Sequence, residues 1–513
     1  MDEDYVAAET ITKADPGYVA ALAKRGITDL GIVRHLPLSA GVFGYEEEVD
    51  RRMIRVLSFL ATENTHSMFA HPIDGIVAHV DLANERVIRL IDTGYDHVPI
   101  ESGDYLDPKL SGPMRTDMKP LRITQPEGAS FTVKNHVLNW QNWEVRIGFN
   151  GREGLTLHDI SFNDRGTKCP ILNRAAISEM VVPYGEPQPT HEWQNYFDAG
   201  EYQFGRLVNC LVLGCDCLGK IQYLDATVVN DFGEPVLLKN AICIHEEDFG
   251  TLWKHTDVFT NSGTVRRQRR LVISFFVTVG NYDYGFYWYF YLDGKIELEC
   301  KATGIVFSSG RPEGEYDFAT EMAPRLGAPC HQHLFAARLD VAIDGNKCHV
   351  DELEREADNK LGRAWLIASS EKLNRLGRPT GYVLYPEGAP LLLAADNSSI
   401  NKRAQYATKH LWVTQFARDE MWAAGYTPNQ HPGYSGLPAY AKANRSVDDE
   451  DIVVWHTFGL THFPRVEDWP IMPVDYAGFS FRPDGFFDRN PTLDVPDDPN
   501  GKEFSENCEC ECP

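Results

Sequence analysis

From about residue 121 to about residue 491, the chain is a succession of short runs in which apolar and polar residues alternate, as in residues 143–149. Alternation with a period of two predicts strands with one buried face, and almost no helical periodicity interrupts it. Roughly 400 residues of this pattern, without an internal repeat, favour one large antiparallel β-sandwich over several small domains. We therefore expect a mainly β protein.

Residues 1–105 have a different pattern, which predicts a small α/β domain ahead of the sandwich. Asp15 and Pro16 before an apolar segment that ends at Gly26 predict a helix. Alternating runs at residues 75–82 and 86–91 predict a hairpin. Residues 106–120 are rich in Pro, Gly and Asp and predict a linker. The acidic residues 492–513 predict a tail with little order.

Charge and hydropathy exclude several classes of protein. The formal net charge is −25, and a surface this acidic argues against a nucleic-acid partner. No apolar stretch reaches the ~18 residues that span a bilayer, so we expect no membrane insertion. The acidic first residues are not those of a signal peptide. We expect a cytoplasmic protein, with the peroxisome as the alternative.

One tyrosine stands at the start of the most aromatic hairpin in the sequence. Residues 285–291 and 295–301 are strand-like, and Asp293-Gly294 between them is typical of a tight turn. Tyr282 precedes this hairpin between Asn281 and Asp283. Taken alone, such a residue is most often an ordinary tyrosine at a strand edge.

A pair of histidines forms a candidate metal site. His331 and His333 are two positions apart, so on a strand both imidazoles project from the same face. Imidazole ligands suit Cu, Zn, Ni or Fe, although an isolated pair of this kind is more often a surface feature. A third ligand is available from either His456 or His462, and spacing alone does not choose between them.

An aspartate among aromatic residues is a candidate general base. Asp198 lies within residues 193–202, which include several aromatic side chains. Desolvation there would raise its pKa, as a base that works near neutral pH requires. The alternative is a turn-forming aspartate before Ala199-Gly200. Tyr184, in a turn with proline and glycine, is uninformative by itself.

Taken together, these segments resemble the copper-containing primary amine oxidases. The resemblance rests on residues 281–283 (Asn-Tyr-Asp), 331–333 (His-Gln-His) and 461–464 (Thr-His-Phe-Pro), with Tyr184, Tyr196 and Asp198 upstream in the expected order. It covers nearly all of the chain before the tail. It implies a homodimer that uses a primary amine and dioxygen and produces an aldehyde, ammonia and hydrogen peroxide.

The resemblance also implies a role for each matching residue. Copper would be bound by His331, His333 and His462, and would convert Tyr282 into the quinone cofactor topaquinone. Asp198 would be the catalytic base, Tyr184 a hydrogen-bonding partner of the quinone, and Tyr196 the gate of the substrate channel; Asn281 and Asp283 flank the cofactor. A second cation such as calcium would be bound by Asp340 and Asp451 with the backbone of Val341 and Ile452. Cys217 and Cys243 would form a disulfide, with two free thiols in a reducing compartment as the alternative.

In one respect the chain departs from the family, because two small domains usually precede the sandwich and only one is expected here. A truncated sequence or a natural short form would explain this. Two rival hypotheses follow: a copper-binding sandwich in which Tyr282 stays unmodified, and a zinc hydrolase that uses the same histidines. The resemblance to the amine oxidases further implies that residues 245–270 are an arm that contacts the partner subunit.

Overall fold

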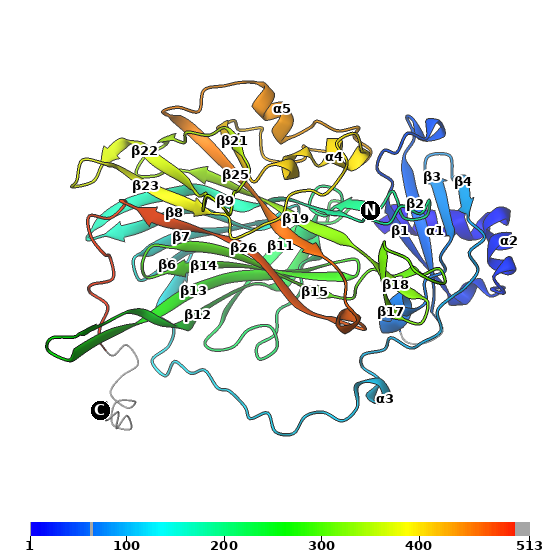
Figure 1. Cartoon of the computed structure of the whole chain (residues 1–513), viewed down its shortest axis with the longest axis horizontal. Coiled ribbons are helices and arrows are strands. Elements are labelled where there is room, and N and C mark those ends of the chain that lie inside the picture. The colour runs from blue at the N-terminus through cyan, green and yellow to red at the C-terminus, as the bar shows by residue number, and fades with distance from the viewer. Residues whose placement is uncertain (1, 62–64, 498–513) are drawn as a thin grey trace.

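The computed structural model describes residues 2–61 and 65–497 and begins with a small α/β unit (Figure 1). Helices α1 (Asp2–Ala14) and α2 (Pro16–Lys24) pack on an antiparallel sheet. The sheet has the order β1 (Val33–Ser39), β2 (Met53–Leu60), β3 (Ile76–Asp81) and β4 (Arg86–Asp92). The Asp15 carboxylate caps α2 by accepting a hydrogen bond from the Tyr18 amide. The predicted helix and hairpin are both present.

A long connection leads from this unit to the rest of the chain. It contains one short helix, α3 (Pro108–Ser111), and residues 112–130 form no strand. Figure 1 shows it running along the outside of the molecule before β5 begins.

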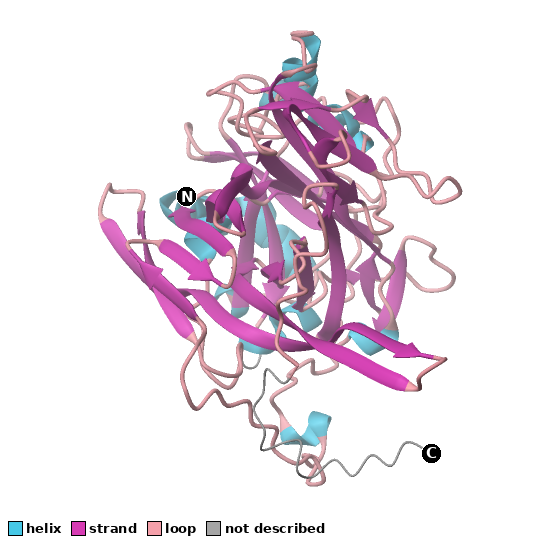
Figure 2. Ribbon diagram, turned by 90° about the vertical axis from the view of Figure 1, so that its left-hand side faces the viewer, coloured by secondary structure: helices cyan, strands magenta, loops and turns pink. Residues whose placement is uncertain are grey.

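The larger part consists of two antiparallel sheets that face each other, which confirms the predicted mainly β sandwich (Figure 2). The first sheet contains β5 (Phe131–Lys134), β6 (Val137–Trp140), β7 (Trp143–Asn150), β8 (Gly154–Asp164), β9 (Thr167–Pro183), β10 (Asn195–Phe197), β19 (His331–Val341), β25 (Glu450–His462), β24 (Leu411–Gln415) and β21 (Glu354–Arg355). The second contains β11 (Gln222–Val229), β12 (Pro235–Asp257), β13 (Ser262–Val279), β14 (Tyr282–Tyr291), β15 (Ile296–Gly304), β26 (Met472–Asp484), β23 (Pro379–Tyr385), β22 (Trp365–Leu373) and β20 (Lys347–His349).

Strand β25 belongs to both sheets, because it pairs with β19 in one and with β20 in the other. This shared strand closes the sandwich. A third, small sheet contains β16 (Ser309–Gly310), β18 (Leu326–Pro329) and β17 (Ala319–Ala323). Two short helices, α4 (Ser399–Arg403) and α5 (Leu437–Lys442), lie in the connections on the outside (Figure 1).

Strand β14 is buried on both of its faces, which explains its aromatic composition. Tyr284, Phe286 and Trp288 point into the core between the sheets. The alternate side chains Tyr287 and Tyr289 form a separate cluster on the opposite face. Burial of one such side chain contributes roughly 1.5–3 kcal/mol, so β14 is a rigid support for the residue at its start.

Strands β12 and β13 extend beyond the sandwich as a long hairpin, visible at the lower left of Figure 1. The side chain of Phe259 at its tip is 94% exposed. Among the residues that the structure describes, no helix is both long enough and apolar enough to cross a membrane.

Candidate active site

The pairing of β19 with β25 brings three histidines together. His331 lies directly opposite His462 in the antiparallel register, and His333 follows on the same face of β19. All three side chains are buried, and one ring nitrogen from each lies within 4.8 Å of the others. His456 lies elsewhere, opposite Ala337, and its ring packs against core aromatic residues.

Neighbouring acceptors orient the imidazoles. Nδ1 of His331 lies 2.8 Å from the carbonyl oxygen of Pro329, so this nitrogen carries the proton and Nε2 keeps its lone pair. Nε2 of His462 lies 3.1 Å from a carboxylate oxygen of Asp468, which leaves Nδ1 free, 3.3 Å from Nε2 of His331. Nε2 of His333 is buried and has no hydrogen-bond partner among the described residues. Three ring nitrogens therefore converge, and a metal would take the place that the Tyr282 hydroxyl holds at Nε2 of His331.

Burial favours the protonation state that a metal requires. Desolvation, reinforced by the charge of His462, lowers the pKa of His331 to about 3. Desolvation likewise lowers the pKa of His333 well below its usual value, and His331 and His462 add to the effect. The two rings are neutral at physiological pH, and neutral imidazole is the form that binds copper or zinc. The donor set thus fits a transition metal.

Tyr282 is the first residue of β14 and lies against the histidines. Its phenol oxygen is 2.9 Å from Nε2 of His331, and its ring is nearly perpendicular to that of His333, with centroids 5.0 Å apart. Burial raises the pKa of its phenol. The Asn281 amide donates to the carbonyl of Ile305 at 2.7 Å, which fixes the turn before β14.

A cavity of about 220 Å³ lies on the other side of Tyr282. Its wall is mostly aromatic and aliphatic, and it includes Tyr5 and residues 36–38 from the small α/β unit. The sandwich contributes Tyr184, Tyr196, Asp198, Tyr202, Tyr282, Tyr284 and Phe307, among others. The cavity therefore brings together the proposed base Asp198, the cofactor precursor Tyr282 and the two upstream tyrosines that the sequence singled out.

Asp198 directly follows β10 and is buried in this wall. Desolvation raises the pKa of its carboxyl well above the usual value, and the charges of Glu179 and Glu201 raise it further. The ring of Tyr184 lies 6.0 Å from that of Tyr196 and stacks on His331 at 4.7 Å. Tyr184 therefore connects the cavity with the histidine group.

The residues proposed for a second cation lie at the far ends of the same two strands. Asp340 on β19 is buried, forms an ion pair with Arg338 at 3.5 Å and accepts a hydrogen bond from Asn173 at 3.2 Å. Desolvation raises the pKa of Asp451, and the charge of Asp340 adds to the effect, so the two carboxylates are neighbours. Val341 is the last residue of β19, and Ile452 follows Asp451 on β25.

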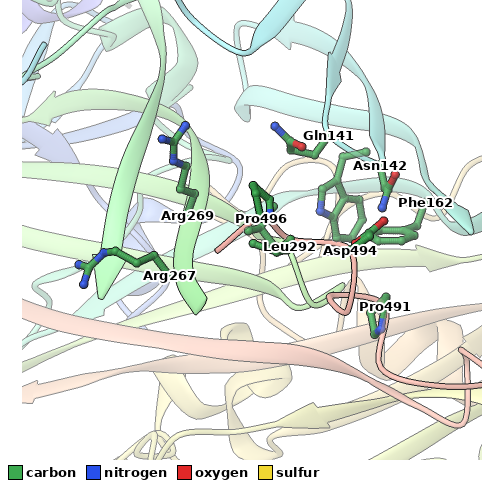
Figure 3. A pocket seen from close by; sticks show the side chains of 11 residues that line it. Gln141, Asn142, Phe162, Arg267, Arg269, Leu292, Pro491, Asp494 and Pro496 are labelled. Carbon is green, nitrogen blue, oxygen red and sulfur yellow. The ribbon is translucent and has the colours of Figure 1, made fainter. Parts of the chain in front are cut away.

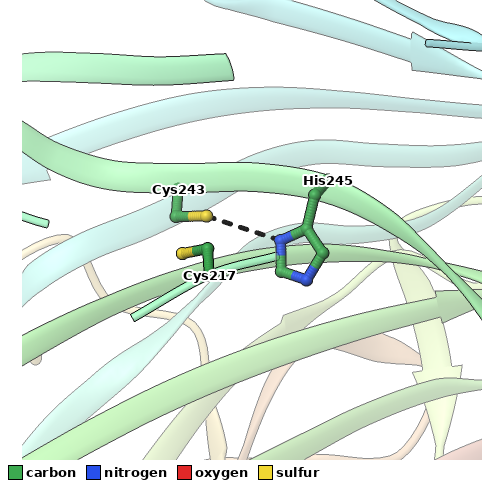
Figure 4. A group of neighbouring side chains, drawn as sticks. All are labelled: Cys217, Cys243 and His245. Atoms are coloured by element: carbon green, nitrogen blue, oxygen red, sulfur yellow. Dashed lines mark hydrogen bonds between the residues drawn. The ribbon is translucent and has the colours of Figure 1, made fainter. Parts of the chain in front are cut away.

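Figure 4 shows the two cysteines that the resemblance joins in a disulfide. Cys217 and Cys243 are free thiols in the structure, and Sγ of Cys243 lies 3.4 Å from Nδ1 of His245. The three ligand atoms lie within 4.8 Å of one another. The structure thus holds the reduced pair side by side, and the disulfide stays a prediction.

A different pocket, of about 270 Å³, lies near residues 491–496 (Figure 3). Its polar lining consists mainly of Gln141, Asn142, Arg267, Arg269 and Asp494. Arg267 is already paired with Asp248. Its described lining residues include no histidine or cysteine and only one carboxylate, so they offer neither a metal site nor an acid–base pair.

Sequence reasoning missed residues that support the site. Asp468 follows His462 by six positions, and the alternation along β14 could have indicated Tyr284, whose phenol oxygen lies 2.9 Å from Nδ1 of His333. Glu179 gave no signal, because nothing in its sequence neighbourhood indicates that it meets Asp198.

A β-sandwich that buries three converging imidazoles beside an aromatic cavity defines a metalloenzyme with an imidazole-bound transition metal. The family "Copper amine oxidase, enzyme domain" matches residues 132–360 and 349–502, and "Copper amine oxidase, N3 domain" matches residues 3–104. The chain belongs to the copper amine oxidase family. It is an enzyme, its reaction is the oxidation of amines, and copper is the metal that the histidine group fits.

Known proteins of this family resemble the chain over almost its whole length. Histamine oxidase of Arthrobacter globiformis is 53% identical, over 96% of this chain and 76% of that protein. A peroxisomal copper-containing diamine oxidase of Nicotiana tabacum is 39% identical, over 96% of this chain and 68% of that protein. The crystal structure of a copper-containing benzylamine oxidase from Hansenula polymorpha superposes with a TM-score of 0.88 and 32% identity, covering 97% of this chain and 84% of that one.

Proposed function

We propose that the enzyme converts primary amines to aldehydes, with release of ammonia and hydrogen peroxide, at a copper ion bound by His331, His333 and His462. The observation that carries this proposal is the position of Tyr282. Its phenol oxygen lies 2.9 Å from a proposed ligand, and the same ring lines the cavity that contains Asp198. One side chain thus lies between the metal ligands and the proposed base.

The cofactor supplies what ordinary side chains lack. Topaquinone made from Tyr282 would provide an acceptor for two electrons from the amine, and copper with dioxygen would provide the oxidising power to form it. The chain's own residues fit this chemistry. The phenol of Tyr282 lies at the histidine group, and the bonded turn at Asn281 together with the buried strand β14 holds it there.

Asp198 is the proposed base that takes the α-proton of the amine. A carboxylate whose pKa is raised by burial is a stronger proton acceptor, which suits a reaction near neutral pH. Tyr184, between the histidine group and the cavity, is the proposed hydrogen-bonding partner of the cofactor. Tyr196 is the proposed gate, since its ring lies between those of Tyr184 and Tyr202.

The lining of the cavity supports an aromatic or otherwise apolar monoamine as substrate. Among the described residues that line it, Asp198 is the only acidic one, so these residues offer no second carboxylate for a second ammonium group. The relatives named for histamine and benzylamine agree with this choice, whereas the diamine oxidase of Nicotiana tabacum is named for the other class. Phenylethylamine should therefore have a higher kcat/KM than putrescine, and the reverse order would refute this substrate class.

The remaining proposals concern assembly and location. The long hairpin of β12 and β13 supports a homodimer in which this arm, with its exposed tip at Phe259, contacts the partner subunit. Asp340 and Asp451, with the backbone of Val341 and Ile452, are the proposed site of a second cation such as calcium. The cytoplasm is the proposed location, with the peroxisome as the alternative; cell fractionation distinguishes the two.

The decisive experiment loads the metal-free protein with copper in air. The protein should become pink and react with phenylhydrazine, and the peptide that contains Tyr282 should change its mass. The control variant Tyr282→Phe should bind copper and stay colourless. If the unaltered protein stays colourless and Tyr282 keeps its original mass, the rival copper-binding sandwich is correct.

The variant Asp198→Asn tests the base separately. The quinone should form as before, because Asn retains the shape of the side chain, whereas amine turnover should fall by roughly 10²–10⁴-fold because proton transfer is lost. Unchanged turnover would remove Asp198 from this role. Activity that requires zinc and not copper would favour the hydrolase hypothesis.

A further inference from the structure

The proposed base is surrounded by other buried carboxylates. Among the groups that raise the pKa of Asp198, the strongest after burial itself is the charge of Glu179, followed by that of Glu201. Glu179 lies on β9 and is completely buried. A buried carboxylate is costly unless it is paired, and the function proposed above gives Glu179 no role.

A β-bulge turns Glu179 toward the base. Where β9 pairs with β19, Glu179 lies opposite Ala336 and Ile177 opposite Ala337, which leaves Ser178 as an extra residue. The hydroxyl of Ser178 bonds at 2.9 Å to the carbonyl of Met421, which fixes the bulge. Bulges of this kind redirect the side chains beside them and are frequent next to active sites.

One oxygen of Glu179 holds the turn that carries Asp198. Oε1 accepts hydrogen bonds from the backbone amides of Met180, Ala199 and Gly200, each 3.1 Å long. Ala199 and Gly200 immediately follow Asp198 in the chain. A Cβ atom on Gly200 would lie 2.7 Å from the other oxygen of Glu179, so the absence of a side chain lets the turn close onto the carboxylate.

The negative charge on the second oxygen of Glu179 is only weakly balanced by nearby donors and cations. Within the part of the chain that the structure describes, Oε2 is buried without a hydrogen bond, and its ion-pair partner, Nη2 of Arg152, is 3.6 Å away. The guanidinium of Arg152 instead donates hydrogen bonds to the backbone carbonyls of Gly425 and Tyr426. By contrast, Glu201 is bonded to Arg403 at 3.0 Å. The charge of Glu179 is therefore the less neutralised of the two.

We infer that Glu179 is a positioning residue for Asp198: it fixes the turn that carries the base, and its charge makes the base a stronger proton acceptor. This inference rests on the role proposed for Asp198. Burial raises the pKa of Glu179 to about 7, so the side chain becomes charged near neutral pH. Among the described residues, the other titratable groups that face Asp198 or its two acidic neighbours are Tyr184, Tyr196, Tyr202, Tyr284, Tyr406, Arg152 and Arg403.

The variant Glu179→Gln tests the effect of the charge. Glutamine keeps an oxygen that can accept the three amide hydrogen bonds, but it carries no charge. In the copper-loaded, quinone-containing enzyme, loss of the negative neighbour should lower the pKa of Asp198. The acidic limb of kcat/KM for a primary amine should therefore move to lower pH by roughly one unit, and the plateau should fall a few-fold because the base is weaker.

Two further variants separate charge from fold. Glu153→Gln is the matched control, because Glu153 is also buried and is paired with Arg174. Glu153 is not among the groups that shift the pKa of Asp198, so the pH profile of kcat/KM in this variant should not move. Glu179→Ala removes the hydrogen bonds as well and should lower kcat at every pH. An unmoved acidic limb in Glu179→Gln, with the quinone content of the unaltered enzyme, would overturn the inference.

The role of Asp198 is checked in the same series. If Asp198→Asn loses turnover while the acidic limb of kcat/KM in Glu179→Gln lies at the same pH as in the unaltered enzyme, only the inference about Glu179 fails. If Asp198→Asn retains full turnover, the proposed base is wrong and the inference falls with it.

Discussion

The two proposed cation sites lie at opposite ends of the same pair of strands, β19 and β25, and burial affects their ligands in opposite ways. At the copper site, burial lowers the pKa of His331 and His333 and so favours the neutral, metal-binding form. At the second site, burial raises the pKa of Asp340 and Asp451 and so disfavours the charged form that calcium requires. Burial in the protein interior therefore favours the metal-binding form of an imidazole ligand and disfavours the metal-binding form of a carboxylate ligand.

Nearby charges extend this contrast. Asp468 fixes the ring of His462 and leaves its inner nitrogen free. Arg338, in contrast, lies 3.5 Å from Asp340 and already partly neutralises it. The copper site thus has support for its ligands, while the second site has a cation that competes for one of them.

The largest expected effect is that of a missing copper ligand. In His333→Ala, one of the three convergent nitrogens is lost, and copper binding, quinone formation and amine oxidation should all fall by orders of magnitude. Metal analysis after dialysis and titration with phenylhydrazine measure the first two. The matched control is His456→Ala, because His456 is also buried but lies opposite Ala337, away from the group. Equal copper loss in both variants would contradict the assignment.

A smaller effect is expected when the support of a ligand is altered. In Asp468→Asn, the ring of His462 loses the carboxylate that fixes its orientation, and the copper affinity should fall by roughly 10–100-fold. Competition with a chelator of known affinity measures this change. The ligands themselves remain, so excess copper should restore the quinone. A variant that stays empty of copper at any concentration would show that Asp468 has a different role.

The fold could be predicted from the sequence where its signals are local. Alternation and turn residues indicate the hairpin of β14 and β15, and the capped helix α2 begins where Asp15 and Pro16 predict it. The closure of the sandwich through β25 could not be predicted, because one strand that pairs with two partners leaves no periodic trace.

The site shows the same division between local and long-range information. Spacing places His331 and His333 on one face, but only the register between β19 and β25 brings His462, and not His456, opposite His331. Glu179 is the clearest omission. Its direction depends on the bulge at Ser178, and bulges interrupt the period on which sequence reasoning relies.

The smallest expected effect concerns the second cation site and tests the contrast between the two sites most finely. Calcium at about 100 times its Kd should stabilise the protein by roughly 2.7 kcal/mol, a shift of a few degrees in Tm. Binding requires charged carboxylates whose pKa values are raised, so the stabilisation should grow as the pH increases through those values. Asp451→Asn should abolish the calcium-dependent shift and leave the copper content unchanged. A Tm that responds to calcium equally in both proteins would mean that the ion binds elsewhere, and a loss of copper in the variant would mean that the two ends of β19 and β25 are coupled.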